Sequence, residues 1–182
     1  MKKNYGTEIC ILTGGLSSRM GRNKSKLRLG GKTLLATIRK TATSLRLPVR
    51  VIDRDLVPRC GPLGGIYTAL KTTSAETILF LACDMPQVSR ALLEKILQYS
   101  QTDCDAIFSW SKDVAGFPFV LNLRTISIVE MLLGKKEFSL KGLAKETHAK
   151  KFRPGHLFKS DLLNVNTPAD WIDLKTTFVE KG

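Results

Sequence analysis

Histidines and paired cysteines are scarce in this sequence of 182 residues. The two histidines, His148 and His156, are too few and too isolated to form a metal-binding cluster. The four cysteines are far apart and form no C-x-x-C pair, so we expect reduced and mostly buried thiols in a cytoplasmic protein. These residues are Cys10, Cys60, Cys83 and Cys104.

Long apolar runs are also absent. No run approaches ~18 residues, the length of a transmembrane helix, and the opening MKKNYGTE lacks the apolar core of a secretory signal. We therefore expect no membrane span and no membrane partner. The sequence has no repeat, linker or low-complexity segment, so we expect one domain over residues 1–182, long enough to bury a core.

Acidic residues are few relative to basic ones. The chain has 16 Asp and Glu against 29 Lys and Arg, which gives a formal net charge of +13. Such an excess favours a polyanionic partner. Nucleic acid is not the expected partner, because no helix-turn-helix, zinc-finger or aromatic RNA-binding signature is present. A substrate that carries several phosphates would use the same charge.

Strand-like and helical patterns alternate along the chain, which predicts an α/β fold with a mainly parallel sheet. The run TILFLAC at 77–83 is continuously apolar, as in a central strand covered on both faces. We expect strands at 9–12, 49–52, 77–83, 105–110, 117–123, 149–152 and 162–165. We expect helices at 33–46, 63–73, 89–99, 125–133, 139–146 and from 168 onward, with Ser89 as a cap and Pro168 in a first turn.

The stretch from Glu8 to Lys32, EICILTGGLSSRMGRNKSKLRLGGK, combines a strand, a glycine turn and a basic segment. The turn at Gly14 and Gly15 lets backbone N–H groups approach an oxyanion, and five cations lie in the ten residues 19–28 that follow. These cations are Arg19, Arg22, Lys24, Lys26 and Arg28. The spacing fits neither G-x-x-x-x-G-K-[ST] nor G-x-G-x-x-G. We interpret the stretch as a phosphate-binding loop; the alternative is a structural turn beside a solvated basic face.

Asp84 follows the apolar run directly. A carboxylate at such a place is costly to desolvate without a partner, so we predict a Mg²⁺ ligand, with a helix cap or loop ion pair as the alternative. Ligands of open α/β sheets lie beyond the carboxyl ends of the strands. Four motifs are expected there: the glycine turn, the 53–65 loop, Asp84 and the segment Asn164–Thr167.

The stretch 8–32 closely resembles the signature of the molybdenum cofactor guanylyltransferases, which runs L-A-G-G-x-S-x-R-M-G-x-x-K and then G-G-K-P-L-L. The matching positions are Leu12, Gly14, Gly15, Ser17, Arg19, Met20, Gly21, Lys24, Gly30, Gly31, Lys32, Leu34 and Leu35. Thr13, Asn23 and Thr33 depart from it. The later segments CDMP, NVNTP, GPLGG and GFP resemble the family's C-D-x-P, N-V-N-T-P, G-P-L-x-G and G-x-P.

This resemblance implies a Rossmann-like three-layer domain that transfers GMP from GTP to molybdenum–molybdopterin, releasing pyrophosphate and forming the guanine dinucleotide cofactor. It implies Lys24, Arg19 and Asp84 as catalytic residues, and Mg²⁺ held by Asp84 and Asn166. It implies nucleotide contacts at Leu12, Thr13, Gly14, Gly15, Lys24, Asp55, Gly61 and Asp84. Proteins of cofactor delivery or molybdoenzyme maturation are further implied partners.

The segment before Gly61 is shorter than is usual in the family, with one strand at 49–52 where two are normal. An acidic residue of this segment normally contacts the nucleotide; Asp55 is our choice and Asp53 the alternative. The Gly61 motif favours guanine over cytosine. Two alternatives stay open: a nucleotidylyltransferase that uses CTP on molybdopterin or an NTP on a sugar or polyol phosphate, and a non-catalytic basic binding protein of the same fold. The intact Lys24 and Asp84 argue against the second.

Overall fold

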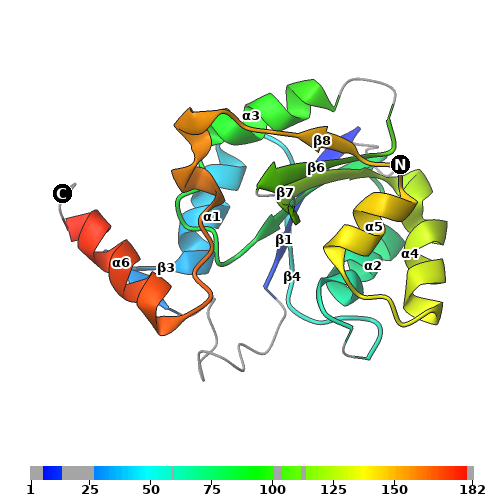
Figure 1. Cartoon of the computed structure of the whole chain (residues 1–182), viewed down its shortest axis with the longest axis horizontal. Coiled ribbons are helices and arrows are strands. Elements are labelled where there is room, and N and C mark those ends of the chain that lie inside the picture. The colour runs from blue at the N-terminus through cyan, green and yellow to red at the C-terminus, as the bar shows by residue number, and fades with distance from the viewer. Residues whose placement is uncertain (1–5, 14–26, 59, 101–103, 112–113, 180–182) are drawn as a thin grey trace.

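The computed structural model describes residues 6–13, 27–58, 60–100, 104–111 and 114–179, with side chains as far as residue 176. A six-stranded sheet in the order β4-β1-β5-β7-β6-β8 forms the centre, and helices cover both faces (Figure 1). The strands are β1 (Thr7–Leu12), β4 (Val49–Ile52), β5 (Thr77–Ala82), β6 (Ala106–Ser111), β7 (Val114–Asn122) and β8 (Lys150–Phe152). The helices are α1 (Leu34–Thr43), α2 (Pro62–Thr72), α3 (Arg90–Tyr99), α4 (Ile126–Gly134), α5 (Leu140–Glu146) and α6 (Pro168–Val179).

The sheet is mainly parallel, which confirms the expected fold class. β1 is parallel to β4 and β5, and β6 is parallel to β8. β7 is the exception and runs antiparallel to both of its neighbours, β5 and β6. Only residues 112 and 113 separate β6 from β7. A connection this short can join antiparallel neighbours, whereas a parallel crossover needs a dozen residues or more.

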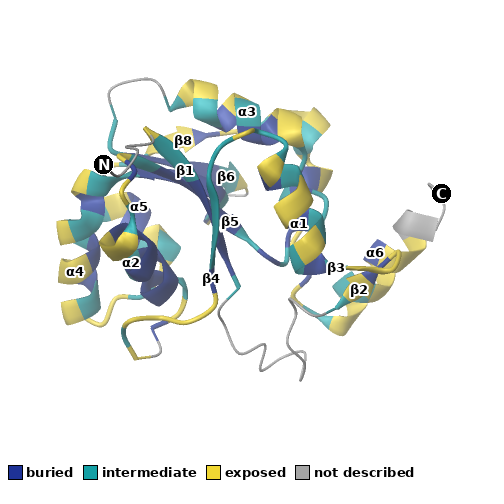
Figure 2. Cartoon of the chain, turned by 180° about the vertical axis from the view of Figure 1, so that it is seen from behind, coloured by how far each residue is buried: buried dark blue, intermediate teal, exposed yellow. Residues whose placement is uncertain are grey.

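Two apolar clusters, one on each face of the sheet, make the three-layer arrangement. The alternation along β1 sends Ile9 and Ile11 to the cluster under α1 and α3, and Cys10 and Leu12 to the cluster under α2, α4 and α5. All four side chains are buried. Figure 2 shows the same pattern as dark strands between helices whose outer sides are exposed. The three layers follow from strands that are apolar on both faces.

The four cysteines are free thiols, as expected; three are buried and Cys104 is partly buried. Burial raises the pKa of the Cys10 thiol to about 12. A thiol with such a pKa stays protonated and unreactive at neutral pH.

Most expected boundaries hold to within a few residues, because the capping residues are in place. The Ser89 hydroxyl accepts a hydrogen bond from the Leu92 N–H (3.2 Å) and so caps α3. Thr33 and Ser139 cap α1 and α5 in the same way. The N-terminal cap is the part of a helix that its own sequence specifies most directly.

The strand expected at 162–165 is wrong. Ser160–Leu162 form a 3₁₀ turn, and the next four residues have no regular structure. The N–H of Val165 donates to the carbonyl of Asp84 (2.9 Å), so this segment bonds to a loop and not to a strand. A small antiparallel ribbon, β2 (Arg28–Leu29) with β3 (Lys32–Thr33), was not expected from the sequence. Its turn needs glycine, since Gly30 and Gly31 have φ of 55° and 79°.

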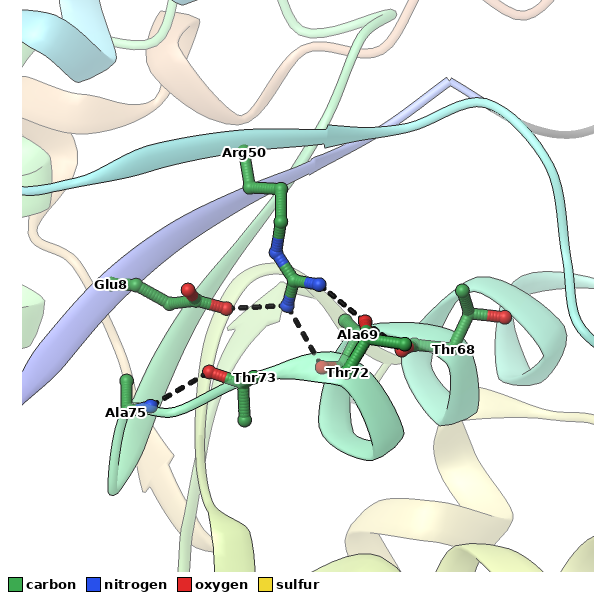
Figure 3. Close-up of polar contacts among 7 residues, drawn as sticks. All are labelled: Glu8, Arg50, Thr68, Ala69, Thr72, Thr73 and Ala75. Atoms are coloured by element: carbon green, nitrogen blue, oxygen red, sulfur yellow. Dashed lines mark hydrogen bonds and ion pairs between the residues drawn. The ribbon is translucent and has the colours of Figure 1, made fainter. Parts of the chain in front are cut away.

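A polar cluster fixes α2 against the sheet near the amino-terminal ends of β1 and β4 (Figure 3). The guanidinium of Arg50 on β4 donates to the carboxylate of Glu8 on β1 (2.6 Å), to the carbonyl of Ala69 (2.8 Å) and to the hydroxyl of Thr72. These contacts join two strands to the last turn of α2. The opposite end of α2 is thereby directed toward the carboxyl ends of β1 and β4.

The last helix, α6, lies to one side of the sheet (Figure 1). It packs through Leu174 on Leu29, Leu34 and Val165, which form a third, smaller apolar cluster. Among the described residues, no helix is long and apolar enough to cross a bilayer.

Candidate active site

A cavity of about 450 Å³ opens at the carboxyl ends of β1, β4 and β5. Most of its lining comes from the loops that follow these strands and from the segment before α6. The lining residues are Leu12, Thr13, Ile52, Asp55, Gly61, Pro62, Gly65, Ala82, Cys83, Asp84, Val114, Ala115, Gly116, Phe117, Leu140, Asn164 and Asn166. The expected convergence of the 53–65 loop and Asp84 at this edge is confirmed. The 164–167 segment also reaches the cavity, but through a hydrogen bond to Asp84 and not from the end of a strand.

The floor of the cavity is held together where three strands end. The N–H and hydroxyl of Thr13 both donate to the carbonyl of Ile52 at 3.0 Å, and the N–H of Cys83 donates to the carbonyl of Leu12 at 3.1 Å. Thr13 stands where the resemblance has alanine, and the bond to Ile52 satisfies its extra hydroxyl. Leu12 and Thr13 therefore lie at the cavity in a fixed backbone conformation.

Asp84 and the two asparagines are brought together by backbone contacts. Asp84 is half-buried at the end of β5, and its carbonyl accepts the N–H of Val165. Val165 is itself 3% exposed, so its side chain anchors the segment in the apolar cluster below α6. Asn164 and Asn166 flank it, and both line the cavity beside Asp84.

Two carboxylates hold this segment in place from outside the cavity. Asp161, 7% exposed, accepts hydrogen bonds from the N–H (2.9 Å) and the hydroxyl of Ser89. Asp170 accepts the N–H groups of Asn166 (2.8 Å) and Thr167 (2.7 Å) at the start of α6. The first contact ties the segment to α3 and the second fixes the backbone of Asn166.

The donor set suits Mg²⁺. Asp84 offers carboxylate oxygens and Asn166 an amide oxygen in one cavity, and Mg²⁺ prefers such hard ligands. Among the described residues, no group of three or more His, Cys, Asp or Glu could hold a metal ion. A site with one carboxylate is compatible with Mg²⁺, because phosphate oxygens and water commonly fill the other positions of this ion.

Asp55 lies against the first turn of α2. A methyl group added to Gly64 would come within 2.5 Å of the Asp55 Oδ2, and one added to Gly65 within 3.6 Å of its Oδ1. Glycine at 64 is therefore what lets the carboxylate approach the helix. Burial raises the pKa of Asp55 above its ordinary value of 3.8. The reserve choice, Asp53, is exposed like Asp55, but only Asp55 lines the cavity.

Gly61 is the N-cap of α2, with a φ of 60° and a ψ of −145°. Side chains rarely adopt this backbone conformation, so glycine is required there. Pro62 occupies the first helical position, where a missing N–H costs little. The N-terminus of this eleven-residue helix borders the cavity and favours negative charge.

On the other side, the cavity is bordered by the start of β7 and by Leu140 of α5. β6 and β7 shift register between Phe108 and Ser109, opposite this part of β7. The Ser109 hydroxyl donates to the carbonyl of Pro118 (2.6 Å). Of these residues, sequence reasoning found only the Gly116 motif. Val114, which is 61% exposed, and Leu140 have no local signal that separates them from ordinary apolar residues.

Four predicted site residues, Gly14, Gly15, Arg19 and Lys24, lie outside the described residues. Thr13 and Leu27 border that segment. The roles assigned to the four residues, like those of Leu12, Thr13, Asp55, Gly61, Asp84 and Asn166, stay predictions.

Sequence comparison with known proteins identifies related families and proteins. The family model described as "MobA-like NTP transferase domain" matches residues 9–52 and 39–150. A probable molybdenum cofactor guanylyltransferase from Carboxydothermus hydrogenoformans is 30% identical over 192 residues, covering 93% of this chain and 95% of the relative. A molybdenum cofactor guanylyltransferase from Xanthomonas euvesicatoria pv. vesicatoria is 30% identical over 175 residues, covering 88% and 90%.

A solved structure shares the fold. Molybdopterin-guanine dinucleotide biosynthesis protein A from Archaeoglobus fulgidus aligns with a TM-score of 0.77 at 19% identity, covering 95% of this chain and 99% of that one. Identity this low bears on the fold alone. The family model and the 30% relatives span most of the sequence. The chain therefore belongs to the MobA-like NTP transferase family.

Proposed function

We propose that the protein transfers GMP from GTP to the terminal phosphate of molybdenum–molybdopterin, releasing pyrophosphate and forming the guanine dinucleotide cofactor. The observation that carries this proposal is one cavity that joins Asp84, Asn166, Asp55 and the N-terminus of α2 at the carboxyl edge of the sheet. The names of the 30% relatives support the same activity.

In the proposed reaction, an oxygen of the acceptor phosphate attacks the α-phosphorus of GTP, and the bond to the β-phosphate oxygen breaks. The protein's task is to position these groups in line and to offset charge. Asp84 and Asn166 would hold Mg²⁺, which when bound withdraws charge from phosphate oxygens. Lys24, with Arg19, would stabilise the negative charge that develops on the departing pyrophosphate.

Base selection is proposed for the side of the cavity formed by Asp55 and Gly61. Guanine offers two donors, N1–H and the 2-amino group, on one edge. A carboxylate can accept both as a bidentate, charge-assisted pair. Asp55 supplies the carboxylate on this side, next to the start of α2. The acceptor would then occupy the side bordered by Gly116, Phe117 and Leu140.

The reaction is proposed for the cytoplasm, where four free thiols would remain reduced. Proteins of cofactor delivery or molybdoenzyme maturation are the proposed recipients of the product. The net charge of +13 supports a substrate pair that carries several phosphates.

The direct test supplies GTP, Mg²⁺ and molybdenum–molybdopterin, and follows both pyrophosphate and the dinucleotide. We expect the two products in equal amounts, and neither after chelation of Mg²⁺. Dinucleotide formed from CTP alone would replace the proposal by the cytidylyl alternative. Failure to bind Mg²⁺–GTP, with salt-dependent binding to random duplex DNA, would favour the non-catalytic alternative.

A further inference from the structure

We propose that Thr68, in the interior of α2 and outside the cavity lining, is a positioning residue for base selection, because its hydroxyl fixes the loop that carries Asp55. The inference rests on the proposed function, since it assigns a cause to the guanine preference of that site. Thr68 has no recognisable sequence signal, and its positioning role follows from three observations.

The first observation is that the Thr68 hydroxyl both donates and accepts a hydrogen bond. Its Oγ1 donates to the carbonyl of Gly64 (2.8 Å) and accepts the N–H of Leu56 (2.8 Å). A hydroxyl has one proton, and the bond to Gly64 uses it. The hydroxyl oxygen can then only accept a further hydrogen bond, and the donor in the 53–58 loop is the N–H of Leu56. Thr68 is 6% exposed, so surrounding atoms restrict the hydroxyl to this position.

The second observation is that the loop has little else to hold it. Of the described loop residues 53–58, Leu56 makes the only hydrogen bond to the rest of the protein. Its side chain is 60% exposed and cannot anchor the loop by packing. The neighbouring Asp53 and Arg54 are exposed too. The conformation of the Asp55–Leu56 peptide therefore depends on the Thr68 hydroxyl.

The third observation is the contact of Asp55 with the helix. Gly64 and Thr68 are four residues apart and lie on one face of α2. Asp55 lies over Gly64, where a methyl group would come within 2.5 Å of its Oδ2, and Leu56 lies over Thr68. Consecutive loop residues thus rest on consecutive turns of one helix, and the carboxylate is placed at the cavity by the bond one residue further on.

This placement matters because a bidentate contact is sensitive to position. A carboxylate must meet N1–H and the 2-amino group together, so a displacement of the order of 1 Å loses much of the discrimination. In the proposed reaction, other segments of the protein hold the triphosphate and Mg²⁺. Loss of the Thr68 bond should therefore affect base preference and leave phosphate chemistry in place.

The test is Thr68→Val, which keeps the shape and removes the hydroxyl. Rates are measured with GTP and with ITP, whose base lacks the 2-amino group. We expect the KM for GTP to rise about fivefold to tenfold, as for loss of one hydrogen bond, with kcat within about twofold. The GTP-to-ITP ratio of kcat/KM should fall by less than this factor, because ITP keeps the N1–H that Asp55 also contacts. Thr68→Ser restores the hydroxyl and should restore the ratio.

Thr147→Val is the matched control. Thr147 is buried, and its hydroxyl donates to the carbonyl four residues earlier, Leu143 (2.7 Å), but it holds no loop near the cavity. The ratio should not change in this variant. Leu56→Pro removes the same N–H from an exposed position and leaves α2 unchanged. Because proline also restricts the backbone of Asp55, the decisive result from this variant is an unchanged ratio, which would count against Thr68. In an Asp55→Ala background, Thr68→Val should have no further effect on the ratio, because Thr68 acts through Asp55.

Failure of this inference and of the proposed function would look different. If wild type prefers GTP and neither Thr68→Val nor Leu56→Pro changes the GTP-to-ITP ratio, Thr68 has no positioning role and the proposed function stands. The inference is also overturned if Thr68→Val lowers the GTP-to-ITP ratio by the same factor in wild type and in the Asp55→Ala background. A wild type that treats GTP and CTP alike would overturn both.

Discussion

At the scale of single residues, Asp84 lies where the central strand β5 ends at the cavity. It follows a strand whose central residues are all buried, and its backbone carbonyl is already used by Val165. Asp84→Asn keeps the size of the side chain and its ability to form hydrogen bonds while it removes the charge, so the variant separates the charge of Asp84 from its shape.

Asp84→Asn should nearly abolish nucleotidyl transfer while the melting temperature stays close to that of wild type. The amide keeps the shape but loses the negative charge that Mg²⁺ requires. Turnover is measured by pyrophosphate release at saturating GTP and acceptor. A variant that keeps more than about a tenth of wild-type kcat, a loss of less than roughly 1.4 kcal/mol, would remove Asp84 from the metal role.

Asp55 leads to a prediction about pH. Burial raises the pKa of its carboxyl group above 3.8. As the pH falls through this raised pKa, the group takes up a proton and can no longer accept from both guanine donors. The GTP-to-ITP ratio of kcat/KM should therefore decline on the acidic side, at a higher pH than for an ordinary aspartate.

The control for this pH effect is Asp55→Ala, whose low ratio should not depend on pH. Protonation of Asp55 would not lower the ratio by unfolding the protein. Because the pKa in the folded state is the higher one, protonation of Asp55 favours the folded state. A wild-type ratio that stays constant down to the ordinary aspartate pKa would mean that Asp55 does not read the base.

At the scale of elements, the segment from Ser160 to Thr167 shows how a local pattern can mislead. The run Leu162–Val165 is apolar enough to be read as a strand. Instead, the N–H of Val165 donates to the carbonyl of Asp84, and the carboxylate of the preceding Asp161 accepts from Ser89. Both partners lie more than seventy residues earlier in the chain. A local apolar pattern shows which side chains are suited to burial, but it does not show which part of the chain the segment's backbone groups bond to.

Asp161→Ala should weaken both stability and metal use. The change leaves the N–H of Ser89 without its acceptor, at a cost of about 1–3 kcal/mol. It also releases the segment that carries Asn166, so the Mg²⁺ concentration for half-maximal rate should rise. Chemical denaturation and a Mg²⁺ titration of the rate measure the two effects.

Asn122→Ala is the control for stability alone. Asn122 caps the turn after β7 by accepting the N–H of Arg124 (2.9 Å), and it pairs with Thr77 at the opposite end of β5 from Asp84. This variant should lose stability without a change in Mg²⁺ demand. An Asp161→Ala protein that behaves in the same way would show that Asp161 serves the fold and not the site.

At the scale of the whole molecule, the sequence predicted what its local patterns encode. The bounds of β4, the cap at Ser89 and the buried strand before Asp84 each depend on residues close in the chain. The meeting of the 53–65 loop and Asp84 at one edge followed from the parallel arrangement of β4, β1 and β5. The ribbon of β2 and β3, the reach of Leu140 into the cavity and the part of Thr68 depend on tertiary contacts, which periodicity does not contain.

The central claim is that this cavity selects guanine. A site that accepts N1–H and the 2-amino group leaves buried polar atoms unpaired with other bases, and that raises the barrier for them. The most direct measurement is kcat/KM for GTP, CTP and ATP with molybdenum–molybdopterin and Mg²⁺. We predict that GTP exceeds each of the others by at least ~10-fold. Equal values for GTP and CTP would contradict the account and leave only membership of the nucleotidyltransferase family.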